Sequence, residues 1–179
     1  MTASETEMRL APARLPKGEP TAFRVIPDEA GLAELVSGLD LLGLRKLRFE
    51  GQIRPEGRND WRLEGRLGAT AIQPCSVTLA PVTTRIDRVV RRLYVAGYVA
   101  PSEAESEMPE DDSIEPLPAS IDLMALLTEE LALALPDFPR AEGAELAATA
   151  FAEPGTEPLT DEALKPFAGL AALRKSLED

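Results

Sequence analysis

Cys75, in the stretch IQPCSVTLAP, is the only cysteine of a 179-residue chain that contains no histidine. Without histidine, the Ser-His-Asp and Cys-His mechanisms and imidazole metal sites are excluded. Pairs of carboxylates do not by themselves indicate a catalytic or metal-binding site, because a chain with 31 acidic residues contains such pairs by chance. The 12 glycines are scattered and show no phosphate-loop spacing. The sequence therefore predicts no catalytic residue and no cofactor.

A reactive Cys75 would need a positive neighbour or the start of a helix to lower its pKa. It instead follows Pro74 at the end of an expected strand, and the next arginine along the sequence is Arg85. The sequence predicts a small, buried side chain here. A thiol-dependent enzyme is the rival hypothesis, which an unaffected Cys75→Ser variant would eliminate. One thiolate and no imidazole do not complete a tetrahedral zinc site, so no structural metal is expected.

The arginines of the middle of the chain are the remaining chemistry-bearing group, because guanidinium groups bind phosphate. They alternate with apolar or small residues in LRFEGQIR and WRLEGRLGA. One interpretation is an RNA-binding or partner-binding sheet face. The other is an ordinary solvated face in which Glu50 and Glu64 pair with arginines across strands. The candidate residues are Arg48, Arg54, Arg62, Arg66, Arg85, Arg88, Arg91 and Arg92.

Charge is divided unevenly along the chain, whose total is −12. Residues 1–20 are balanced, residues 21–100 carry +3 and residues 101–179 carry −15. Because affinity for nucleic acid comes mainly from basic side chains at phosphates, any RNA contact is expected in the middle segment alone. Residues 101–115 hold seven acidic and no basic residues. This stretch is a solvated spacer or a docking segment for a basic protein.

The elements that must position the arginines follow from hydrophobic periodicity. Alternation predicts an antiparallel hairpin from residues 47–54 and 61–69, with PEGRND as its turn. Residues 82–95 fit either a helix or a strand; we expect a strand with a bulge near Arg88. A helix over 121–135 is expected to keep Glu129 and Glu130 outside. Further expected elements are a strand at 20–26 and helices at 28–40 and 166–178.

These elements predict an α+β fold, an antiparallel sheet covered by helices, with an acidic loop and a C-terminal helix. We expect one domain over residues 1–179, with a flexible N-terminus at 1–19, an acidic loop at 101–119 and a loose segment at 138–165. The first twenty residues have charges and prolines where a signal peptide needs an apolar run. No stretch approaches the roughly 18 apolar residues of a membrane span. We therefore expect a cytoplasmic protein that contacts no membrane.

Three landmarks in one order, IQPCSVTLAPV, SIDLMALLTEELALALPDFP and PFAGLAALRKSL, resemble the YceD family of bacterial and plastid proteins. These proteins are linked to accumulation of large-subunit ribosomal RNA. The resemblance runs from about residue 20 to the end. Many members have a second cysteine three residues after the first and a cysteine cluster after the LALP helix, and this chain has neither. The matching motif residues are Cys75, Leu79, Pro81, Asp122, Leu135 and Pro136.

The resemblance implies a non-enzymatic factor in large ribosomal subunit biogenesis that supports accumulation or processing of the large-subunit RNA. The implied partner is ribosomal RNA or a large-subunit assembly component. A second hypothesis, from another class, is an acidic adaptor or chaperone that binds a basic ribosomal protein without contacting RNA. Charge reversal in 103–115 would separate the two, because it should abolish partner capture by the adaptor alone.

Overall fold

The computed structural model describes residues 8–99 and 113–145. The chain divides into two compact units, residues 1–142 and 143–179, and every element below lies in the first. A five-stranded sheet has the order β2-β3-β4-β5-β6, and a two-stranded sheet pairs β1 with β7. The strands are β1 Arg9–Leu10, β2 Thr21–Val25, β3 Gly43–Glu56, β4 Asp60–Pro74, β5 Pro81–Val95, β6 Ile114–Pro116 and β7 Ile121–Asp122; the helices are α1 Glu29–Gly38 and α2 Leu123–Ala134, with a short 3₁₀ helix at Pro12–Arg14.

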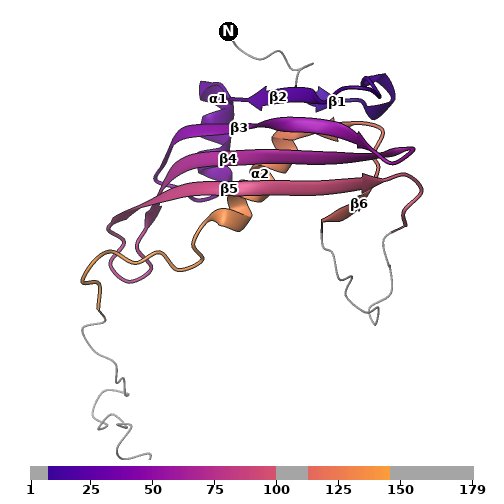
Figure 1. Ribbon diagram of the computed structural model, residues 1–179. Helices are drawn as coiled ribbons and strands as arrows, with labels where there is room; N and C mark the ends of the chain where they lie inside the picture. Colours follow the sequence, from indigo (N-terminus) through magenta and orange to yellow (C-terminus); the bar gives the residue numbers. More distant parts are fainter. Residues whose placement is uncertain (1–7, 100–112, 146–179) are drawn as a thin grey trace, which may run out of the picture. The chain divides into compact units, whose positions relative to one another are not determined.

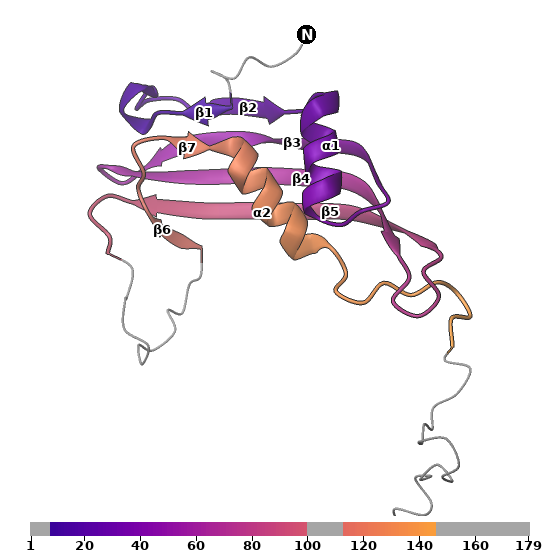
Figure 2. The ribbon, with the colours of Figure 1, turned by 180° about the vertical axis from the view of Figure 1, so that it is seen from behind.

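Strands β2 to β5 are antiparallel, and β6 joins the edge of β5 in parallel. Both helices cover the same face of this sheet, as Figures 1 and 2 show from the two sides. None of the described helices lies on the other face, which we call the open face. The expected α+β class is confirmed, and so are the expected hairpin and the strand reading of residues 82–95.

The covered face carries the core, because alternate side chains of each strand point to it. Phe49 lies opposite Leu67, and Ile53 lies opposite Leu63. All four side chains are buried, and they pack with Leu123, Leu127 and Leu131 of α2. Apolar and polar residues therefore alternate along these strands because only one face of the sheet is buried.

Each helix begins at an aspartate that caps it. The Asp28 carboxylate accepts a hydrogen bond from the Gly31 amide at 2.9 Å. The Asp122 carboxylate accepts from the amides of Met124 and Ala125, both at 3.0 Å. These backbone donors, that of Ala125 first, hold the pKa of Asp122 below its ordinary value. The caps satisfy amides that the helices themselves leave without partners.

The expected bulge near Arg88 is wrong. The pairing of β4 with β5 runs without a shift from Trp61 opposite Tyr94 to Pro74 opposite Pro81. The irregularity lies instead between β3 and β4, at Arg45 to Arg48, where Lys46 has a positive φ of 53°. Apolar residues alternate poorly along β5 because Arg88 and Arg92 point to its covered face.

Several short elements lie where the sequence indicated loops. Strand β1 and the 3₁₀ helix fall within the expected flexible stretch 1–19, and β6 falls within the expected loop 101–119. Residues 138–145 contain no helix or strand. Residues 1–7, 101–112 and 146–165 of these stretches, and the expected helix 166–178, lie outside the described residues.

Candidate nucleic-acid interface

The open face presents arginines in rows that cross the sheet, because opposed residues of antiparallel strands share a face. Six of the eight candidate arginines lie on it. Their positions follow from the register, since the buried residues of β3 and β4 occupy the alternate positions. These six are Arg48 and Arg54 of β3, Arg62 and Arg66 of β4, and Arg85 and Arg91 of β5.

Two further arginines join this face and were not among the sequence candidates. Arg24 of β2 lies opposite Glu50, and Arg45 of β3 lies opposite Thr70. Arg24 was visible in the sequence, because it alternates with the buried Phe23 and Val25. Arg45 was not, because the irregularity at Lys46 changes the phase between it and Arg48.

The carboxylates of the open face form loose ion pairs with these arginines. Glu50 lies 3.6 Å from Arg24 and 3.5 Å from Arg48, and Glu64 lies 3.7 Å from Arg54. All of these side chains are more than a third exposed, so solvent screens each pair to about 0–1 kcal/mol. A phosphate that approaches the face therefore displaces little favourable energy.

Tighter pairs lie towards the edges of this arginine-bearing face. The Arg62 guanidinium donates to both carboxylate oxygens of Glu56, at 3.0 and 3.1 Å. This hydrogen bonding lowers the pKa of Glu56. Arg85 likewise donates to both oxygens of Asp87, at 2.9 and 3.1 Å, and lowers the pKa of that group. Arginines held in this way present their remaining donors in a fixed direction.

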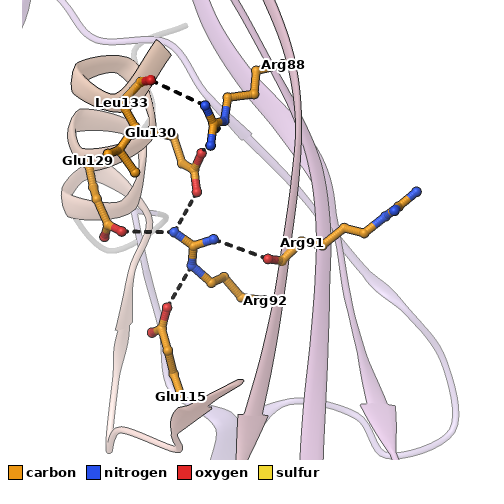
Figure 3. A network of polar contacts seen from close by, with 7 residues as sticks. All are labelled: Arg88, Arg91, Arg92, Glu115, Glu129, Glu130 and Leu133. Carbon is orange, nitrogen blue, oxygen red and sulfur yellow. Dashed lines mark hydrogen bonds and ion pairs between the residues drawn. The ribbon is translucent and has the colours of Figure 1, made fainter. Parts of the chain in front are cut away.

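Arg88 and Arg92 do not share the open face. They lie opposite Leu67 and Leu63, so they point to the face that α2 covers. Arg88 lies 2.8 Å from Glu130 of α2, and Arg92 lies 2.6 Å from the same carboxylate. Figure 3 shows both guanidinium groups turned to the helix while the neighbouring Arg91 points away from it. These ion pairs hold α2 against β5.

Glu130 is the centre of this buried network, and its expected place on the outer side of the helix is wrong. Only 1% of the residue is exposed. Arg92 also contacts Glu115 of β6 at 2.7 Å and Glu129 at 2.9 Å. Burial lowers the pKa of Arg92, but the three carboxylates, with Glu130 first, raise it above its ordinary value. Burial also raises the pKa of Glu115, which Arg92 lowers only in part.

Cys75 lies at a tight corner between β4 and β5. It is buried, as the sequence predicted. Its sulfur accepts hydrogen bonds from the amides of Val77, Thr78 and Ala141, at 3.4, 3.5 and 3.3 Å. Since Ala141 follows α2 in the chain, the sulfur ties the β4–β5 turn to the segment that leaves the helix. The Ser76 amide reinforces this tie by donating to the Pro139 carbonyl at 2.8 Å.

The hydrogen bonds to the Cys75 sulfur predict a pH dependence of stability. The Thr78 side chain first, and then the backbone amides, lower the pKa of the thiol to about 6. A folded-state pKa below the unfolded value of about 8.5 stabilises the fold above pH 8.5, and this contribution is lost as the pH falls through 6. Urea unfolding between pH 6 and 8.5 should show a rise in stability that Cys75→Ser lacks. Thiolate absorbance that titrates near pH 8.5 in the folded protein would contradict this.

A family profile described as "Large ribosomal RNA subunit accumulation protein YceD" matches residues 63–174, more than half of the chain. The chain belongs to the YceD family. The resemblance seen in the sequence motifs is thereby confirmed. Searches among curated proteins and among solved structures found no match.

All of the YceD motif residues except Asp122 have structural roles at one end of the sheet. Leu79 adopts a positive φ of 62° in the turn after Cys75, and Pro81 begins β5. Asp122 caps α2, and Leu135 ends it. The Pro136 carbonyl accepts a hydrogen bond from the Gln73 side chain at 3.2 Å. Apart from Asp122, which lies at the start of α2, the motif residues therefore hold together the corner where β4, β5 and the end of α2 meet.

The YceD match contains only part of the open face. It begins within β4, so it includes Arg66, Arg85 and Arg91, whereas β2 and β3 precede it. Its description refers to accumulation of the large ribosomal RNA subunit and names no reaction. Among residues 8–99 and 113–145, no three acidic, cysteine or histidine side chains gather as metal ligands would. No helix in the described part of the chain is long and apolar enough to span a membrane.

Proposed function

We propose that this protein is a cytoplasmic, non-enzymatic factor in large ribosomal subunit biogenesis that contacts ribosomal RNA through the open face. The family description supports the ribosomal part of the proposal. The eight arginines aligned on the uncovered side of the sheet support the RNA contact. That alignment is the observation that carries the proposal, because the helices leave this face accessible (Figures 1 and 2).

The spacing of the face suits a phosphate backbone. Strands lie about 4.8 Å apart, and same-face residues along a strand lie about 7 Å apart. Guanidinium groups on such a lattice offer paired donors to several phosphates at once. The ion pairs that occupy them now are exposed and weak, with nitrogen–oxygen distances of 3.5 to 3.7 Å for Glu50 and Glu64. When RNA binds, the weak arginine–glutamate contacts are therefore replaced by arginine–phosphate contacts.

The aromatic residues of the sheet indicate which part of RNA is contacted. Phe23, Phe49, Trp61 and Tyr94 are all buried on the covered face. Proteins that read unpaired bases stack them on exposed aromatic rings, and these strands offer none. The proposed contact is therefore with the phosphate backbone and its shape. Affinity should depend strongly on salt and weakly on base sequence.

Replacing Arg48, Arg54, Arg62 and Arg66 together with glutamine tests the proposal. We expect weaker binding to a large-subunit RNA transcript and to an unrelated transcript of equal length. The logarithm of affinity should fall less steeply with the logarithm of salt, by about 3 in slope, since each lost phosphate contact removes about 0.7. Filter binding over a series of KCl concentrations measures both quantities, and a thermal melt confirms that the variant folds.

The matched control removes four positive charges elsewhere. Arg14, Lys17, Arg58 and Arg140 are exposed and lie outside the central strands. Changing these four to glutamine lowers the net charge equally, yet should leave most of the salt slope intact. Equal losses of affinity and salt slope in the two variants would mean that binding depends on net charge and not on the open face. If the open-face variant binds as the unchanged protein does, the open face is the wrong surface, and a basic protein partner for the acidic residues becomes the better hypothesis.

A further inference from the structure

Gly68 lies in the middle of the open face, beneath two converging guanidinium groups. It lies opposite Arg48 of β3 on one side and Asp87 of β5 on the other. A Cβ atom on Gly68 would lie 3.3 Å from Cζ of Arg48 and 3.4 Å from Nη2 of both Arg48 and Arg85. The tips of two positive side chains from different strands therefore approach one point above the glycine.

More positive charge surrounds the same point. Arg66 precedes Gly68 on the same face of β4, and Arg45 and Arg85 flank Thr70, the next residue of that face. Asp87 is the carboxylate opposite Gly68, and its contacts at 2.9 and 3.1 Å are with Arg85 alone. Arg66 forms no ion pair within the described residues. Glu50 is the second carboxylate of this region, opposite Arg66 and 3.5 Å from Arg48. The four arginines Arg45, Arg48, Arg66 and Arg85 thus carry more positive charge than these two carboxylates neutralise.

Arg85 is fixed in this cluster. Its Nε and Nη2 atoms donate to Asp87, and its Nη1 atom lies 3.4 Å from the Thr70 hydroxyl. A guanidinium has five N–H donors, so donors remain for another acceptor. Because its position is set before a ligand arrives, less side-chain entropy is lost on binding.

The glycine itself is not required by the backbone conformation. Its φ lies outside the left-handed region, unlike those of Gly57, Gly97 and Gly143. Glycine weakens a strand interior and often marks a place where a ligand or another backbone comes close. No other backbone approaches this face of Gly68, where the nearest atoms are the arginine tips. Because glycine has no side chain, the tips of Arg48 and Arg85 occupy the space directly over Gly68.

We propose that Arg48, Arg66 and Arg85 bind one phosphate group where the arginine tips converge above Gly68, and that in the assembled complex this group is a phosphodiester of the RNA backbone. The inference rests on the proposed function for the identity of the ligand, but the phosphate site itself does not. A tetrahedral anion at this point accepts hydrogen bonds from guanidinium groups on three strands and relieves their mutual repulsion. Asp87 holds two donors of Arg85 and orients that side chain, so the phosphate accepts from the donors that remain.

Gly68→Val tests this site without changing any charge. The valine side chain would displace the tips of Arg48 and Arg85, which lie 3.3 to 3.4 Å from the position of an added Cβ atom. Valine favours a strand, so the fold should persist. We expect RNA affinity to fall about three- to tenfold and the salt slope to decrease by about 0.7, one phosphate contact. Ala22→Val is the matched control, because it adds apolar volume on the same face two strands away; it should leave affinity within twofold.

A titration with inorganic phosphate, followed by the arginine Nε–Hε and backbone amide NMR signals, separates the two proposals. We expect saturable shifts at Arg48, Arg66, Arg85 and Gly68 that disappear in Gly68→Val. Shifts spread evenly over the face, or unchanged RNA affinity in Gly68→Val, would overturn the site while leaving the RNA proposal intact. If the unchanged protein binds no RNA, the proposed function fails, and the phosphate titration still decides whether the site exists.

Discussion

Replacing Glu130 with glutamine should lower the free energy of unfolding by about 3 kcal/mol, the lower end of the range for breaking a buried ion pair. The substitution keeps the size of the side chain but leaves Arg88 and Arg92 without the carboxylate they share, at 2.8 and 2.6 Å. Arg92 is the more affected, since only 14% of its side chain is exposed. It retains Glu115 and Glu129, which is why the larger values of the range are not expected.

Urea unfolding at pH 7 measures this loss, and Glu129→Gln is its control. Glu129 precedes Glu130 in the same helix and contacts the same arginine at 2.9 Å, yet its side chain is 55% exposed. Its replacement should cost less than about 1 kcal/mol, as exposed pairs do. Equal losses in the two variants would mean that burial does not set the strength of this network.

The network also explains where sequence reasoning about β5 succeeded and failed. The content of Val, Thr, Ile and Tyr favoured a strand, correctly. The alternation of apolar residues was misread, because Arg88 and Arg92 occupy inward positions next to Ile86 and Val90. A pattern of apolar residues assumes that charges face solvent, and a buried ion pair breaks that assumption. Only the position of α2 over β5 shows that the inward charges are neutralised.

The sequence contains a weak indication that Glu130 is buried. It lies four residues after Leu126 and three after Leu127, both buried, so it falls within the apolar stripe of the helix. Two arginines four residues apart on one strand must likewise share a face. Each observation alone fits a solvated side chain. Their pairing depends on a contact between residues about 40 positions apart, which local periodicity does not encode.

The open face was predictable wherever the strands are regular. Arg48, Arg54, Arg62 and Arg66 alternate with buried residues in two strands that pair without interruption from Arg48 onward. The short strands were not predictable in the same way. Strands β1 and β7 have two residues each, and their pairing joins Arg9 to Asp122, far apart in the sequence. Segments of that length carry no periodicity, so tertiary contacts alone define them.

Gly51→Ala should destabilise the fold by about 3 kcal/mol, the upper part of the usual range for overpacking, because no side-chain movement relieves it. Gly51 of β3 lies opposite Gly65 of β4. An added Cβ atom would collide with the Glu64 carbonyl oxygen and lie 2.5 Å from the Gly65 Cα atom. Both are backbone atoms of the paired strand, so the two strands must separate at this point.

The position of Gly51 makes this a test of the open face as well. Arg48 and Arg54 lie on either side of it, and the register that glycine permits sets their places opposite Gly68 and Arg62. Gly38→Ala is the control, because Gly38 has nothing within 4 Å of an added Cβ atom and ends α1; it should be neutral or slightly stabilising. Calorimetric melting compares the two variants. A Gly51→Ala protein with unchanged melting temperature would show that β3 and β4 do not approach as closely as described, and the arginine rows derived from their register would then have to be redrawn.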